Sequence, residues 1–423
     1  MKKIVLSLAA LLLLGGNLFA QKHRTCLTHD KFVEAMKDPA TAARRAQVER
    51  DIETYLNAHP QAASRTSGNQ DILVTVPVVV HVLYYNSTQN ISDAQIQTQI
   101  DVLNEDYAHR NPDSVNTPAV FQSLMANTEI QFCLASSDPS GNATTGIERR
   151  QVTVTQIGST NKYYQYAQGG LTAWNRNYYL NIWICDIDGG FTLGFSYLPG
   201  TASAAYDGVV IDYNFFGTIG TAQSPFDLGR TATHEVGHWF NMEHIWADEP
   251  SCSADDGVTD TPQQKGENYG CPSYPQTTQS GGRCSTADPS SMYMNYMDYT
   301  DDACMNMFTY GQAARMQAAV NGARATLLTS TGCSIPSGIS TPGGKLGMSV
   351  YPNPSAGVYS FSTGFFNGEA QLSVTDIAGR VVLEKTYQQG DQLIFDITDQ
   401  PSGSYFVDVK IGDHREVKQV VKN

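Results

Sequence analysis

The run HEVGHWFNMEH, which begins at His234, combines three histidines with one glutamate. On a helix, His234 and His238 lie four residues apart, so both rings leave the same face about one turn from each other, with Glu235 beside them. His244 can reach the same point only if the helix ends after His238 and the chain turns back. Such a turn normally needs a residue with a left-handed backbone, and Asn241 stands at that place. The spacing predicts one metal site with three imidazole ligands.

Three neutral imidazoles are a ligand set for catalytic zinc, because they leave a fourth tetrahedral position for water. The ion lowers the pKa of that water toward ~7, and Glu235 is placed to take its proton and pass it to a leaving amine. The alternative is that these histidines are surface or core residues that fall in line by chance. Such fixed offsets are rare in a chain with nine histidines. The sequence therefore predicts zinc-dependent hydrolysis.

The same run resembles the HExxHxxGxxH signature of the metzincin metallopeptidases, with Asn241 where the family usually has glycine. Asparagine is the non-glycine residue that best tolerates positive φ, so the departure is mild. Metzincins carry a methionine-containing turn under the zinc, and the resemblance assigns this role to Met297. Tyr299 resembles the tyrosine that steadies the oxyanion of the tetrahedral intermediate. Ordinary core packing is the alternative for both residues.

Four blocks narrow the resemblance, namely RTATHEVGHWFNMEH, CSADDGVTDTP, YGCP and NYMDYTDDACMNMFT. Together they resemble the pappalysin family, in particular its small prokaryotic members, over roughly residues 70–330. The resemblance implies an α/β (α+β) metzincin-like catalytic domain with a twisted sheet and an active-site helix. It also implies a secreted endopeptidase that cuts before Arg, or Lys. Two alternatives stay open: a gelatinase-like metzincin outside the pappalysins, and an exported binding or adhesion protein with a structural zinc site.

Eight cysteines in an exported chain point to an oxidising compartment. Four of them lie between the zinc helix and the sequence just past Met297. Sequence alone allows three pairings for four cysteines. The pappalysin resemblance selects disulfides between Cys252 and Cys284 and between Cys271 and Cys304.

Cys26 lies in a short segment ahead of the catalytic part. A thiolate there can take the open zinc position and keep the enzyme silent, and the family's small members resemble this arrangement. The sequence therefore predicts a cysteine switch, with an unpaired or bridging cysteine as the alternative. Cys133 and Cys185 fall in strand-like runs, as buried thiols or a further bridge, and Cys333 has no assignment.

The domain boundaries follow from composition. We expect a signal peptide (1–20), a pro-segment with the cysteine switch (21–64), the catalytic domain (65–333), a Pro-, Gly- and Ser-rich linker (334–348) and a C-terminal domain (349–423). Family members resemble one another in cutting before Arg, so the polar stretch around Ser64 and Arg65 is a candidate for self-processing.

The loop after Cys252 is rich in oxygen donors, the ligand type that calcium prefers. The resemblance makes Asp256 and Thr261 the best side-chain ligands, and Asp255 and Thr259 carbonyl donors. A solvated acidic loop is the alternative.

Three acidic residues follow Met297, where the pocket for the residue after the scissile bond is expected. They are Asp298, Asp301 and Asp302. A carboxylate at the base of this pocket would pair with a guanidinium and favour Arg. The sequence leaves open which of the three does so.

Periodicity outlines the elements that must position these residues. A helix is expected within 31–57, a buried strand at 74–86, and a helix that begins with a capping box of Ser92 and Gln95. A second capping box, Thr309 with Gln312, begins a last helix that runs to about Leu328. Further strands are expected at 129–135, 150–156, 179–187 and 208–216.

The last part of the chain alternates apolar and polar residues in short segments separated by turns, which predicts a small antiparallel β-sandwich. The segments YPNPSAG, DIAGRVV, PSGSYFVDV and EVKQVVKN resemble the C-terminal sorting domain of the type IX secretion system. The alternative is a carbohydrate- or adhesin-like binding module. With the signal peptide, the resemblance implies a secreted or cell-surface protein that the type IX machinery exports.

The formal net charge is -14, which disfavours nucleic acid and anionic membranes as partners and favours basic peptides. Ordinary solubility charge is the alternative explanation. No segment after the signal peptide has ~18 consecutive apolar residues, so no membrane span is expected. We expect a monomer that acts on proteins or peptides.

Overall fold

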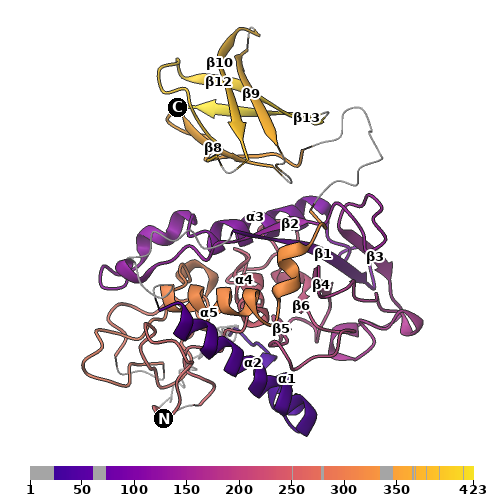
Figure 1. The fold of residues 1–423 in the computed structure, drawn as a ribbon, viewed down its shortest axis with the longest axis vertical. Coiled ribbons are helices and arrows are strands. Elements are labelled where there is room, and N and C mark those ends of the chain that lie inside the picture. The colour runs from indigo at the N-terminus through magenta and orange to yellow at the C-terminus, as the bar shows by residue number, and fades with distance from the viewer. Residues whose placement is uncertain are drawn as a thin grey trace, which may run out of the picture.

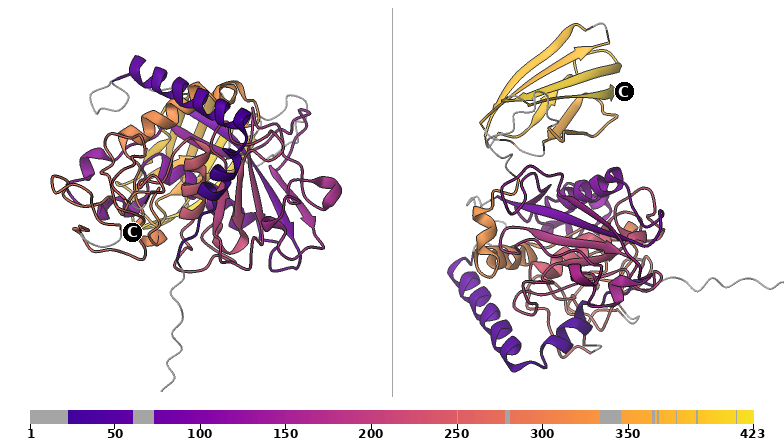
Figure 2. Two further views of the ribbon diagram at one scale, coloured as in Figure 1. Left: turned by 90° about the horizontal axis from the view of Figure 1, so that it is seen from below. Right: turned by 90° about the vertical axis from the view of Figure 1, so that its right-hand side faces the viewer.

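The computed structural model describes residues 23–60, 73–249, 251–277, 281–333, 346–363, 366, 368–377, 379–389, 391–412 and 414–423. The predicted signal peptide, the predicted cleavage point at Ser64 and Arg65, and residues 334–345 of the predicted linker lie outside them. Within the described residues, no helix is long and apolar enough to cross a membrane. The described chain forms a mixed α/β part and a C-terminal all-β part (Figures 1 and 2), so the predicted fold class is confirmed.

The α/β part is built on a sheet with the strand order β2-β1-β4-β6-β5, in which β3 also pairs with β1. Its strands are β1 (Val74–Tyr84), β2 (Ile130–Leu134), β3 (Ile147–Gln151), β4 (Leu180–Cys185), β5 (Gly194–Ser196) and β6 (Val209–Asp212). The pairings are parallel, except that β5 runs antiparallel to β6. β1 reads VTVPVVVHVLY and is buried along almost its whole length, as expected of a strand covered on both faces.

Three details of the sheet differ from the prediction. The strand expected at 208–216 ends at Asp212, because the Asp212 side chain caps a 3-10 helix, Tyr213–Phe215, that follows it. The strand expected at 150–156 is displaced, because β3 pairs with Val80–Tyr84 of β1 and both strands end together at Tyr84 and Gln151. The short edge strand β5 was not predicted. It has only three residues, too few for alternation to show. This edge strand lies beside the helix that carries the histidines, so it shapes one wall of the site.

Two helices pack on the sheet and share its hydrophobic core (Figure 1). They are α3 (Asp93–Tyr107) and α4 (Arg230–Trp239). The Ser92 hydroxyl caps α3 by accepting from the backbone N–H of Gln95. The reciprocal half of the predicted capping box is wrong, because the Gln95 amide instead donates to Phe216 O and to Thr221.

Helix α5 (Tyr310–Asn321) begins with the predicted capping box of Thr309 and Gln312, and both of its halves are present. The α-helix ends at Asn321 rather than near Leu328, because Gly322 has φ -114° and ψ -103°, outside the helical region. A 3-10 helix, Ala325–Thr329, covers the remainder.

The predicted pro-segment forms two helices, α1 (Thr28–Ala35) and α2 (Pro39–Ala58), where periodicity suggested one. The break lies at Asp38, whose side chain caps α2 by accepting from the backbone N–H groups of Ala40 and Thr41. Proline suits the first turn of a helix, but its ring blocks continuation from a preceding turn. Helix α2 packs on α5 through Ile52, which contacts Ala318 and Ala319.

Loops make up most of the chain between α4 and α5, and disulfides tie them together. The structure joins Cys252 to Cys284 and Cys271 to Cys304, the pairing that the resemblance implied. A third disulfide joins Cys133 in β2 to Cys333. Cys185 is a buried free thiol. Of the two cysteines in strand-like runs, Cys133 therefore forms a further bridge and Cys185 is a buried thiol.

The C-terminal part consists of two antiparallel sheets with the orders β10-β9-β12-β13 and β11-β8-β7. Its strands are β7 (Ser349–Tyr351), β8 (Val358–Ser362), β9 (Glu369–Asp376), β10 (Val381–Gln388), β11 (Ile394–Asp396), β12 (Gly403–Ile411) and β13 (His414–Lys422). Inward-facing residues of both sheets share one core, including Phe361 and Val407. The predicted β-sandwich is therefore confirmed.

Candidate metal centre and active site

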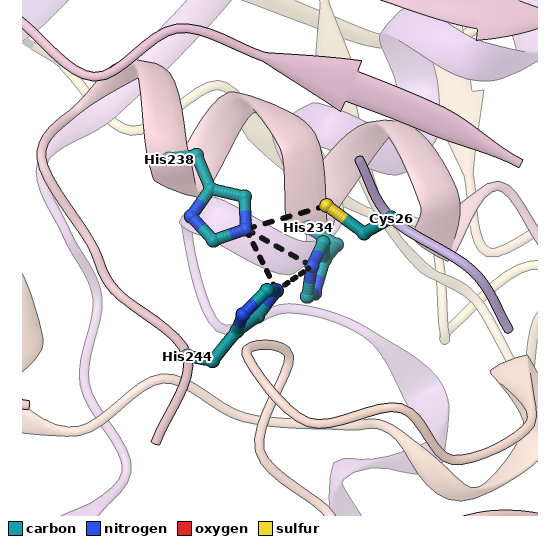
Figure 3. A group of neighbouring side chains, drawn as sticks. All are labelled: Cys26, His234, His238 and His244. Atoms are coloured by element: carbon teal, nitrogen blue, oxygen red, sulfur yellow. Dashed lines mark hydrogen bonds between the residues drawn. The ribbon is translucent and has the colours of Figure 1, made fainter. Parts of the chain in front are cut away.

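Helix α4 and the turn after it bring the three histidines together (Figure 3). His234 and His238 leave the same face of α4 one turn apart. The chain then reverses at Asn241, whose φ of 75° is left-handed, and the N–H of Met242 donates to Gly237 O. This reversal carries His244 back toward the other two rings. All three histidines are at most 1% exposed.

The three Nε2 atoms form a nearly equilateral triangle. The distance is 3.2 Å from His234 to both His238 and His244, and 3.1 Å between His238 and His244. Nitrogen ligands bound at ~2.0–2.1 Å around a tetrahedral ion are ~3.3 Å apart, so the spacing fits zinc.

The other ring nitrogens fix the tautomers. Nδ1 of His234 lies 2.7 Å from Tyr296 O, and Nδ1 of His238 lies 2.7 Å from Met242 O. A carbonyl oxygen can only accept, so each Nδ1 carries the proton and each Nε2 turns a lone pair inward. Nδ1 of His244 lies 2.5 Å from the Asp248 carboxylate, with the same result. Three lone pairs that converge in a buried space repel one another unless a cation binds them.

Cys26 provides a fourth donor from a different segment of the chain (Figure 3). Its Sγ lies 3.7 Å from Nε2 of His238, and the four donor atoms are all within 4.8 Å of one another. The segment is held against the edge strand β5, because the N–H of Leu27 donates to Gly194 O and the N–H of Leu193 donates to Thr25 O. Burial raises the pKa of the Cys26 thiol, so a thiolate here depends on a bound cation.

Glu235 is fully buried next to the three rings. Its carboxylate accepts from the Thr28 hydroxyl at 2.9 Å, and that hydroxyl accepts from the N–H of Ser196 at 2.8 Å. Burial raises the pKa of Glu235 to about 7, within the range expected of a general base. A Cβ at Gly194 would lie 3.1 Å from Cγ of Glu235, so glycine at this position leaves the carboxylate its space.

The segment around Met297 lies directly under the histidines. A Cβ at Gly237 would lie 2.6 Å from Sδ of Met297, so α4 can pack this closely only with glycine there. The hydroxyl of Tyr299 donates to Cys26 O at 3.3 Å, and its ring contacts His234 and His244. Met297 therefore packs against the helix that carries His234 and His238, and Tyr299 lies beside two of the three rings.

The three candidate aspartates for the specificity pocket have different surroundings, and Asp301 is the one that is only partly buried. Asp302 is fully buried, and one of its oxygens lies 2.5 Å from Nη2 of Arg24 in the pro-segment. Its other oxygen accepts from the backbone N–H groups of Leu228 and Arg230. Asp298 instead accepts from the Gln264 amide and from the loop that contains Asn268.

Arg24 is held by more than this carboxylate. Its Nε donates to Thr300 O at 3.3 Å and its Nη1 donates to the Thr231 hydroxyl at 3.4 Å. The guanidinium also lies 5.0 Å from the ring centroid of Phe226. Sequence reasoning missed Arg24, although an arginine two residues before Cys26 was a signal that could have found it. It also missed Thr28 and Asp248, whose roles depend on contacts between distant segments.

The predicted calcium loop is compact. Thr261 Oγ1 lies 2.8 Å from one oxygen of Asp256 and 3.0 Å from the other. The Asp255 carboxylate accepts from the N–H of Gly257, whose φ of 72° is left-handed. Within the described residues, one group of acidic, histidine or cysteine side chains is spaced to hold a metal ion, and it consists of Cys26 and the three histidines.

The fold and the site together define a metalloendopeptidase. The sheet has an antiparallel edge strand, one helix carries two histidines, a third histidine follows a sharp bend, and a methionine lies beneath them. The profile of the Pregnancy-associated plasma protein-A family (peptidase family M43) matches residues 167–321, and that of the Secretion system C-terminal sorting domain matches residues 349–423.

Curated and solved relatives agree with this class. Extracellular metalloproteases of Arthroderma benhamiae and Pyricularia oryzae are 30% and 32% identical over 63% and 60% of this chain, which is 84% and 78% of theirs. Mature mirolysin of Tannerella forsythia, solved with a cleaved peptide, is 45% identical over 62% of this chain and 98% of its own, with a TM-score of 0.57. A promirolysin mutant of the same organism is 41% identical over 72% and 96%, with a TM-score of 0.62.

The chain belongs to the pappalysin family of metallopeptidases and carries a type IX sorting tail. It is a secreted or cell-surface protein. The family assignment excludes an exported binding or adhesion protein and a gelatinase-like metzincin outside the pappalysins. The match of the sorting domain excludes a carbohydrate- or adhesin-like module at the C-terminus.

Proposed function

We propose that the protein is a secreted zinc endopeptidase, made as a latent precursor, that cuts peptide bonds before arginine. The observation that carries the proposal is the convergence of three Nε2 lone pairs from His234, His238 and His244 with Cys26 Sγ in one buried space. This donor set suits zinc better than the harder cations. When bound, zinc supplies a Lewis acid that lowers the pKa of its water and polarises the scissile carbonyl.

The chain's own residues would do the remaining work. Glu235 takes the proton of the attacking water and delivers it to the amine that leaves. Tyr299 donates its hydroxyl hydrogen to the carbonyl oxygen of the substrate as negative charge develops there. Support comes from the contacts of these side chains in the precursor: Tyr299 donates to the Cys26 carbonyl and Glu235 accepts from Thr28. The pro-segment thus meets both groups as a peptide substrate would.

The specificity proposal rests on Arg24 and Asp302. The Asp302 carboxylate, the Thr300 carbonyl and the Thr231 hydroxyl are arranged around the planar guanidinium of Arg24. A guanidinium donates in several directions at once, whereas an ammonium is a compact charge. A substrate arginine in this pocket would therefore make more hydrogen bonds than a lysine. Arginine is the preferred residue after the scissile bond, and lysine is a weaker second.

Replacing Asp302 by asparagine should lower kcat/KM for peptides with Arg after the scissile bond by about 10²-fold, because a charge-assisted contact is lost. Asn retains the size of the side chain, so the pocket keeps its shape. The measurement is a set of matched peptides that differ only in Arg, Lys or Leu at that position. Asp301→Asn, a change at a partly buried neighbour, should alter the rate by no more than about twofold. An enzyme that cuts Arg and Leu peptides equally well would refute the pocket.

Latency follows from the same contacts. The pro-segment of residues 21–64 occupies three positions at once: the fourth zinc position through Cys26, the base through Thr28 and the pocket through Arg24. Cleavage before Arg65 would separate it from the catalytic domain of residues 65–333. The sorting domain, after the linker of residues 334–348, would be removed during export and leave a monomeric enzyme.

We also propose that calcium binds the loop of Asp255, Asp256, Thr259 and Thr261. The Asp256 carboxylate is buried beside the Thr261 hydroxyl, and burial raises its pKa well above the usual range, so a cation there would stabilise the charged form. A chelator that removes calcium and spares zinc should lower the melting temperature by roughly 5–10 °C. Asp256→Asn should abolish this response. An unchanged melting temperature and activity after chelation would exclude the site.

A further inference from the structure

Helix α2 of the pro-segment contacts the catalytic domain at a point separate from the contacts of Cys26. Both polar ends of the Asn241 side chain are used by this helix. Nη1 of Arg45 donates to Oδ1 of Asn241 at 2.7 Å, and Nδ2 of Asn241 donates to Oε1 of Glu49 at 3.1 Å. Asn241 is fully buried in this arrangement. One residue of the zinc-binding turn is thus held by the pro-segment.

An ionic network surrounds this contact. Glu49 pairs with Arg45 on its own helix and with Arg315 of α5, both at 2.6 Å. Nε of Arg315 donates to the backbone carbonyl of Asn241, and Glu243 lies 3.4 Å from Arg45. The side chains of Arg45 and Arg315 are only 4% and 7% exposed, so these ion pairs must offset the hydration that the two guanidinium groups lose on burial.

Apolar contacts extend the same interface. Ile52 is 1% exposed against Ala318 and Ala319 of α5. A Cβ at Gly200 would lie 3.3 Å from Cγ2 of Val48, so the helix comes within contact of this loop as well. These contacts come from the face of α2 that also carries Arg45 and Glu49, which are four residues apart. Arg44, by contrast, donates to the Thr41 hydroxyl of its own helix.

The turn itself does not require asparagine. With φ at 75°, glycine would adopt this backbone at no steric cost, and asparagine is only the best tolerated of the other residues. The side chain therefore contributes something beyond the bend. Its two hydrogen bonds both go to α2, and α2 belongs to the part of the chain that activation removes.

We propose that Asn241, Glu243 and the α5 residues Arg315, Ala318 and Ala319 form a docking site for helix α2, which holds the pro-segment on the enzyme independently of Cys26. The proposal rests on the latency described above. Two joined contacts raise the effective concentration of each, so loss of one alone does not free the other. A pro-segment severed between residues 60 and 73 therefore stays bound as an inhibitor until α2 dissociates.

The experiment uses the full chain with Glu235→Gln, which prevents self-processing, and a specific protease site introduced within residues 61–72. After cutting, the rate at which the severed pro-segment leaves is followed by gel filtration at successive times. Asn241→Gly and Arg45→Ala should each increase this rate by roughly 10–100-fold, because each removes hydrogen bonds that involve a charged group. Arg44→Ala, on the neighbouring position of α2, should change it by no more than about twofold.

Arg45→Ala lies in the pro-segment and leaves the catalytic domain unaltered, so the test does not depend on how Asn241→Gly folds. A severed pro-segment that leaves both variants as slowly as it leaves the parent chain would overturn the docking site. Cys26→Ser, made in the chain that keeps Glu235, separates this outcome from a failure of the latency proposal. If latency fails, that variant gains no activity, and the dissociation rates still report on α2. If only docking fails, Cys26→Ser is active while Asn241→Gly dissociates like the parent.

Discussion

Replacing Glu235 by glutamine is expected to lower kcat of the processed enzyme by roughly 10³-fold, the scale of general base catalysis. Glutamine has nearly the same shape and still accepts a hydrogen bond, but it cannot take the proton of the attacking water. Glu235 itself is not a metal ligand in this arrangement, since the three Nε2 atoms and Cys26 Sγ provide the donors. Zinc content should therefore stay at one ion per chain, as measured by elemental analysis.

A matched change tests whether the effect belongs to this carboxylate. Glu267→Gln removes a carboxylate of the loops after α4 that accepts from the Tyr269 hydroxyl, and it should leave kcat within about twofold. Hydrolysis by the Glu235→Gln enzyme at more than a tenth of the parent rate would contradict the role of Glu235. Loss of zinc from that variant would instead show that Glu235 is part of the metal site.

Replacing Cys26 by serine is expected to turn the latent precursor into an active or self-processing one. A thiolate bound to zinc is at least as strong a contact as a charge-assisted hydrogen bond of ~3 kcal/mol, so its loss should raise the open fraction about 10²-fold. The contacts of Arg24 and Thr28 remain and keep the rise finite. Activity of the freshly secreted precursor against an Arg-containing peptide, with the length of the chain followed in parallel, measures the change.

Cys185→Ala is the control, because Cys185 is the other free buried thiol of the described chain and lies in β4. It should leave the precursor latent. A Cys26→Ser precursor that is as silent and as stable against self-processing as the parent would show that the thiol plays no part in latency.

Local sequence determined much of the site. The spacing of His234 and His238 follows from one turn of helix, and the bend at Asn241 follows from the few residues that tolerate positive φ. These relations involve neighbours in the chain, so they could be predicted without the fold. The same holds for the Thr309 cap of α5 and for the alternating strands of the C-terminal sandwich.

Contacts between distant segments could not be predicted in this way. Asp298 and Asp302 lie four residues apart, but the fold turns one toward loop amides and the other toward Arg24. Cys133 and Cys333 are 200 residues apart, and their pairing depends on where the chain returns after α5. The three-residue strand β5 takes its conformation from pairing with β6 rather than from its own residues.

X-ray diffraction from crystals of the intact precursor, recorded on both sides of the zinc absorption edge, would show whether the three histidines and Cys26 hold one zinc ion. We expect one strong anomalous peak per chain, within bonding distance of Nε2 of His234, His238 and His244 and of Sγ of Cys26. A precursor without a zinc peak among these atoms, or one in which the ring of His244 faces away from the other two, would contradict this expectation.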